Sequence, residues 1–133
     1  MYLLPIPELI LYGAFDRGIK NQERIVLRTQ TYLNLAPYGL LLTLQQGKTA
    51  TPFIDQFFWF GETILDPETW VYVYTGVGLP RMTKTLGTNQ PAYVIHWNRE
   101  NVIFNQDLVN PTLIRIDAAT NNSSDSSLLL PSR

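Results

Sequence analysis

The chain has 133 residues, the size of one domain that can bury a single core without help from disulfides or metals. Ten basic and eleven acidic residues give a formal net charge of -1, so there is no overall positive field to attract nucleic acid or an anionic membrane surface. The absence of cysteine excludes disulfides, thiolate metal sites and a cysteine nucleophile, and it leaves the cellular compartment undetermined.

The amino-terminal residues 1–7 carry no recognisable targeting signal. They lack a basic start, and Pro5 and Pro7 interrupt their apolar run, so no cleavable signal peptide is expected. No stretch of the chain approaches the ~18 uncharged apolar residues of a membrane span. Because proline lacks a backbone N–H and favours an extended neighbour, residues 1–7 are predicted to form an extended arm. A virion and the cytoplasm remain candidate locations.

The first half of the domain is rich in strand patterns. Residues 8–15 predict a strand that ends at the turn-like 16–18, and residues 40–45 predict a strand buried on both faces, followed by a turn at 46–49. The clearest alternation lies in residues 24–35, where two central threonines favour a long strand over a helix. Its expected buried face holds Ile25, Leu27, Thr29, Thr31, Leu33 and Leu35.

The segment around residues 52–60 has two interpretations. Thr51 followed by Pro52 could begin a helix, with the threonine as the N-cap. The aromatic run that follows is typical of a strand, and Gly61 would make any helix short. We therefore predict a strand at 57–65 and leave the short helix as the alternative. A turn at residues 66–68 follows.

Two strands of β-branched and aromatic residues, 69–75 and 92–97, are predicted to pair or to lie near each other. The connection between them, residues 76–91, contains no element predicted from the pattern, and connections that long are usually functional or mobile. Gly76 and Gly78 lack the third glycine and the Lys-Ser/Thr pair of a phosphate-binding loop. They are interpreted as turn glycines with positive φ.

The last part of the chain alternates turns and strands. Residues 98–101 predict a hairpin-like connection to a strand at 102–104, and a loop at 105–111 precedes a final strand at 112–117. The Ser- and Asn-rich residues from 118 onward are expected to be disordered. The whole pattern predicts an all-β, single-domain antiparallel sandwich or barrel of about eight strands. The domain would span residues 8–117, with an arm at 1–7 and a tail at 118–133.

Catalytic residue types are scarce. Every serine lies in the tail, and His96 is the only histidine, so a catalytic triad cannot be assembled in the domain. His96 is expected to pack within its strand, since a metal role would need carboxylate partners that the sequence does not place. Glu62, Asp66 and Glu68 lie between two tryptophans; they are interpreted as turn acids, with a glycosidase pair as the alternative. No catalytic residue, cofactor or metal ligand is assigned.

These features favour a non-enzymatic structural or assembly subunit of a symmetric complex, such as a phage or virus particle, an injection machine or a surface layer. Its partners would be further copies of the chain or other subunits, with no nucleic acid and no membrane insertion. A carbohydrate-binding module that uses exposed Trp and Tyr, and a small carboxylate-using glycoside hydrolase, are the alternatives. The expected partner contacts lie in both termini and in the 76–91 loop, at Leu3, Leu4, Ile6, Arg81, Lys84, Leu128, Leu129 and Leu130.

Overall fold

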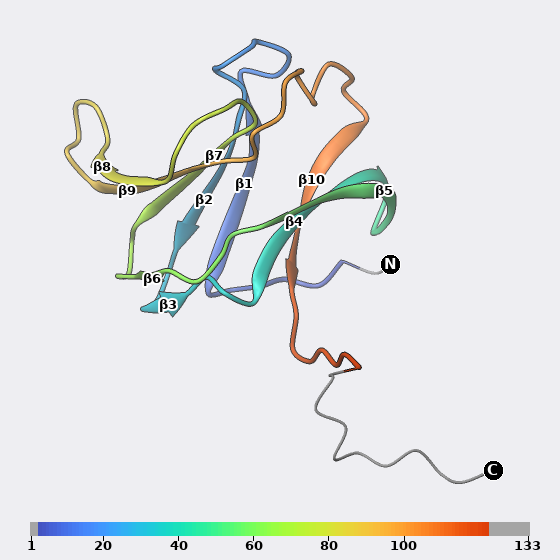
Figure 1. Cartoon of the computed structure of the whole chain (residues 1–133), viewed down its shortest axis with the longest axis horizontal. Helices are drawn as coiled ribbons and strands as arrows, with labels where there is room; N and C mark the ends of the chain where they lie inside the picture. Colours follow the sequence, from blue (N-terminus) through green and yellow to red (C-terminus); the bar gives the residue numbers. More distant parts are fainter. Residues whose placement is uncertain (1–2, 123–133) are drawn as a thin grey trace, which may run out of the picture.

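The computed structural model describes residues 3–122, apart from the side chains at positions 45, 46, 54 and 55, and it contains no helix in that range (Figure 1). Ten strands form two packed sheets and a short extra ribbon, which confirms the predicted all-β sandwich. The larger sheet has the order β1 (Leu9–Phe15), β2 (Arg24–Thr29), β7 (Trp70–Tyr74), β9 (Pro91–His96), β8 (Arg81–Lys84). The smaller sheet has the order β10 (Val109–Arg115), β4 (Tyr38–Gln46), β5 (Thr49–Trp59), and β3 (Leu33–Asn34) pairs with β6 (Ile64–Leu65).

The core lies between the two sheets and is built from alternate residues of their strands. In β2 and β7 every second side chain points inward, because successive side chains of a strand face opposite sides of the sheet. Residues from the loops close the ends of the sandwich. The buried cluster comprises Leu9, Ile25, Leu27, Leu35, Tyr38, Leu40, Leu42, Phe60, Leu65, Val71, Val73, Tyr93, Ile95 and Phe104.

The long strand predicted at 24–35 has the predicted register but not the predicted length. Leu27 is fully buried and Gln30 is exposed, as predicted, but Thr31 is exposed and Leu33 only partly buried, although both were assigned to the inward face. The strand ends at Thr29, whose backbone N–H donates to the Thr69 carbonyl at 3.0 Å and whose hydroxyl donates to the Asp66 carbonyl at 2.8 Å. These bonds turn the chain away from the sheet, and the pattern resumes in the separate strand β3.

The two central strands do pair, and they pair in parallel, with Trp70 opposite Ala92 and Tyr74 opposite His96. Parallel neighbours need a crossover connection, and here the crossover is the segment 76–91 itself. The segment is not unstructured as expected, because it contains β8, which lies antiparallel to the outer side of β9. In Figure 1 the β8–β9 hairpin projects from one end of the molecule.

Several other predictions need correction. Residues 52–59 belong to β5 rather than to a helix, since the strand continues through Pro52 along β4. The strand predicted at 57–65 ends at Trp59 and resumes only in β6. Residues 102–104 form no strand, because the amides of Ile103 and Phe104 donate to a buried carboxylate instead of to a neighbouring strand. The final strand, predicted at 112–117, is β10, which begins at Val109 and ends at Arg115.

Candidate interaction surface

Three of the five most exposed large apolar side chains described in residues 3–122 lie in the segment 76–91. Its strand β8 forms one edge of the larger sheet, and all four of its residues are exposed. Leu86, at the tip of the hairpin, is 100% exposed, and Leu79 in the crossover is 82% exposed. A folded protein gains nothing by holding such residues in water, and exposed apolar groups on an open sheet edge mark an interaction surface. The exposed apolar residues of this surface are Val77, Leu79, Met82 and Leu86.

Arg81 and Lys84, both predicted to contact partners, lie on this edge strand. Both side chains are exposed, and neither forms an ion pair with a side chain that the structure describes, a set that leaves out Asp55. Positive charges on an edge strand oppose pairing with an arbitrary second strand. They favour a partner that presents acidic side chains to them, and so they contribute selectivity more than affinity.

The crossover runs over the end of β9 and packs on His96. Gly78 lies against the imidazole so closely that a Cβ at this position would overlap the ring atoms of His96. Neither Gly76 nor Gly78 has a positive φ, so the interpretation as turn glycines was wrong. Gly78 is therefore required because only a residue without a side chain fits against the ring. The amide of Gly78 donates to Oδ1 of Asn98 at 3.0 Å and holds the crossover in place.

His96 is half-buried, as predicted for a packed histidine, and its ring stacks on Tyr74 with centroids 5.6 Å apart. Burial lowers the pKa of His96 below 6.5, and the positive charge of Arg81 lowers it further, while the backbone of Gly76 opposes the shift. Neither ring nitrogen has a hydrogen-bond partner of good geometry. The imidazole is therefore held neutral under the crossover.

The outer face of the larger sheet carries a second group of aromatic residues. Trp70, Tyr72 and Tyr74 alternate outward along β7, and the Trp70 indole donates to Oε1 of Gln90 at 2.7 Å. The guanidinium of Arg28 lies 4.7 Å from the Trp70 ring centroid, and the Tyr12 ring lies 5.4 Å from it. Tyr12 and Arg28 were not assigned from the sequence, although each can be placed on this face once the pairing of β1, β2 and β7 is known.

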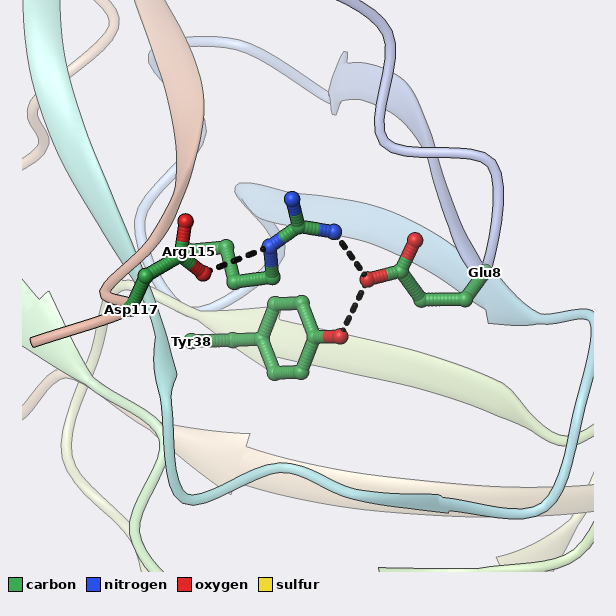
Figure 2. A network of polar contacts seen from close by, with 4 residues as sticks. All are labelled: Glu8, Tyr38, Arg115 and Asp117. Atoms are coloured by element: carbon green, nitrogen blue, oxygen red, sulfur yellow. Dashed lines mark hydrogen bonds and ion pairs between the residues drawn. The ribbon is translucent and has the colours of Figure 1, made fainter.

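A polar network joins the arm to the sandwich (Figure 2). The Tyr38 hydroxyl and the Arg115 guanidinium both donate to Oε2 of Glu8, at 2.5 and 2.8 Å, and Arg115 also pairs with Asp117 at 3.1 Å. The hydrogen bond from Tyr38 is the main cause that lowers the pKa of Glu8. Burial and the adjacent Glu8 raise the pKa of Tyr38 to about 12. The start of β1 is thereby tied to β4 and β10.

The arm is less free than predicted. The amide of Leu3 donates to the Lys48 carbonyl at 3.2 Å, and Ile6 packs against the core of its own domain. Leu4 is 82% exposed, and cavities of about 410 and 320 Å³ lie between the arm and β10. Of the three arm residues assigned to partner contacts, only Leu4 is left largely in water. Leu128, Leu129 and Leu130 lie outside the described residues.

The acidic cluster does not form a two-acid pocket. Glu62, Asp66 and Glu68 are all exposed, and the Asp66 carbonyl is occupied as an acceptor for the hydroxyls of Thr29 and Thr69. This arrangement contradicts the hydrolase hypothesis at these residues. The carbohydrate hypothesis required at least one exposed tryptophan, and Trp59 is 48% exposed, so that hypothesis stays a prediction.

The buried carboxylate of Glu23 binds backbone amides of two loops, at residue 18 and at residues 103–104. Glu23 is fully buried and accepts four hydrogen bonds, from the amides of Gly18, Ile103 and Phe104 and from the Thr75 hydroxyl, at 2.6 to 3.0 Å. Burial tends to raise the pKa of Glu23, but the four donors outweigh burial and hold the pKa below 4.5. The sequence offered no signal for this role, because three of the four donors, in Thr75, Ile103 and Phe104, lie far from Glu23 in the chain.

Comparisons with protein-family models, with curated proteins and with solved structures found no match to this chain. Within residues 3–122, no three acidic or histidine side chains are grouped in a way that could hold a metal ion. The same residues include no helix that could cross a membrane.

Proposed function

We propose that the protein is a non-enzymatic subunit of a symmetric assembly, and that it contacts its neighbours through the β8 edge and the crossover, residues 76–91. The observation that carries this proposal is the exposure of four apolar side chains, Met82 on the open edge strand β8 and Val77, Leu79 and Leu86 in the segments that flank it. β8 pairs with β9 on one side only, so its other side is available for an added strand. A second copy of the chain is the neighbour that we test first.

The chemistry of the surface supports a specific contact. Leu79 and Leu86 would supply apolar burial, worth about 1.5 to 3 kcal/mol for each fully covered side chain. Arg81 and Lys84 would set the register by pairing with acids of the neighbour. Because Leu86 makes no use of its apolar surface in the isolated domain, its replacement should leave the fold intact.

Sedimentation velocity over a wide concentration range tests the proposal. The wild type should form a defined oligomer, and Leu79→Ser or Leu86→Ser should weaken it by about tenfold to a hundredfold. Leu108→Ser is the matched control, because Leu108 is 67% exposed but lies outside the hairpin. The proposal would be refuted if the wild type stays monomeric and no partner protein co-purifies with it from its source. So would an equal loss of assembly in all three variants.

A further inference from the structure

A cavity of about 540 Å³ opens beside the three-stranded sheet, on the side of the loop 98–103. Its apolar wall includes Leu42 from β4 and Phe53 from β5, together with Ile103 from the loop. Its polar side is formed by Gln56 and by the loop residues around Arg99. A concave site of this size, with an apolar wall and a few convergent polar groups, is typical of a small-molecule site.

The polar wall is built in advance of any ligand. The amide of Arg99 donates to the Thr75 carbonyl at 2.8 Å, and the amide of Asn98 donates to the Gly76 carbonyl at 3.0 Å. The other end of the loop is held by the hydrogen bond that the amide of Ile103 donates to the buried carboxylate of Glu23. A loop that is pinned at both ends loses little conformational entropy when a ligand binds, which favours affinity.

Arg99 gives the cavity its charge. Its Nη1 donates to Oε1 of Gln56 at 2.7 Å, and its guanidinium lies 5.9 Å from the Trp97 ring centroid. These contacts orient the side chain, yet Arg99 forms no ion pair with any of the described side chains, which do not include that of Asp55. An oriented guanidinium without an acidic partner, next to an apolar wall, is complementary to a carboxylate that is attached to an apolar group.

We propose that this cavity binds a small monocarboxylate with an apolar body, with the carboxylate on Arg99 and the body against Leu42, Phe53 and Ile103. The carboxylate of Glu100 also lines the cavity and is exposed. Its negative charge disfavours ligands with two or more negative charges, such as phosphates, and so favours a single carboxylate. The site is separate from the β8 edge, so the proposal does not depend on assembly.

Titration of the full chain with sodium hexanoate, followed by amide chemical shifts in two-dimensional NMR, tests the proposal. Saturable shifts should be confined to residues 98–103 and to the facing strands, and hexanamide, the neutral isostere, should bind at least about tenfold more weakly. Arg99→Gln should cause a similar loss. Lys20→Gln, which removes an exposed cation that does not line the cavity, should leave hexanoate binding unchanged.

Gln56→Glu is a second variant that keeps the test decisive if Arg99→Gln fails to fold. It places a carboxylate against the Arg99 guanidinium, and this internal partner should compete with hexanoate and abolish binding. Shifts that do not saturate, that spread over the whole surface, or that are equal for hexanoate and hexanamide would overturn the proposal. Undiminished hexanoate binding by Gln56→Glu would overturn it as well.

Discussion

Replacement of Glu23 by glutamine should destabilise the domain far more than a change of one atom suggests. In the wild type, Oε1 accepts from Gly18 and Phe104, and Oε2 accepts from Thr75 and Ile103. A glutamine oxygen can accept one pair of bonds, but its amide group would direct N–H groups at the other pair of donors. With the amide group on the Oε2 side, the Thr75 hydroxyl can rotate to accept from it, but the Ile103 N–H is left without an acceptor.

The magnitude follows from the bonds that are lost. A hydrogen bond to a charged group contributes about 1.5 to 3 kcal/mol, so the loss of the bond from Ile103 costs about that much, and the remaining bonds weaken because their partner is now neutral. A neutral amide is easier to bury than a carboxylate, which offsets part of this cost. We expect Glu23→Gln to lower the free energy of unfolding by about 2 to 4 kcal/mol, a large share of the ~5 to 15 kcal/mol of a typical domain.

Urea denaturation followed by tryptophan fluorescence measures this difference, with Glu62→Gln as the matched control at an exposed glutamate. The pKa of Glu23 is lower in the folded chain than its ordinary value of 4.5, so the stability that this group supplies is present above pH 4.5 and is lost as pH falls through the folded pKa. The gap between wild type and variant should therefore shrink in acid. A gap below about 0.5 kcal/mol at neutral pH would refute the reasoning.

Two further predictions concern Gly78 and Tyr38. Gly78→Ala should lower the free energy of unfolding, measured by urea denaturation, by about 1 to 3 kcal/mol, because the new methyl group overlaps the His96 ring. Most of that loss should vanish in a His96→Ala background. If the effects of the two substitutions are additive in the double variant, this explanation is wrong. The pKa of Tyr38 is raised from 10.0 to about 12, so the stability that its phenol supplies is lost as pH rises from 10 towards 12. Burial also raises the pKa of Tyr72, but Tyr38 should be the last tyrosine to ionise in an ultraviolet titration, and Tyr38→Phe should remove that last step. A single common step near pH 10 in the wild type would rule it out.

The candidate surface could be recognised from the sequence only in part. Arg81 and Lys84 were assigned to partner contacts because they lie in a long connection, and both are exposed on the sheet edge. The exposed leucines of the same segment, Leu79 and Leu86, were not singled out, because exposure depends on which strands cover the segment. Ile6 was predicted to contact a partner but packs on its own domain. The sequence does not separate these outcomes, because an apolar side chain in an arm can be buried against its own domain or against a partner.

The sequence by itself determined the fold class and the inward faces of the strands. The alternation of Ile25, Leu27 and Thr29, and the β-branched and aromatic run from Trp70 to Tyr74, are local properties, because a strand turns successive side chains to opposite faces. Only the tertiary structure decided that β7 and β9 pair in parallel with β8 outside them, since pairing joins segments that are distant in the chain. The same holds for Glu23 and Gly78, whose roles come from neighbours that no local pattern identifies.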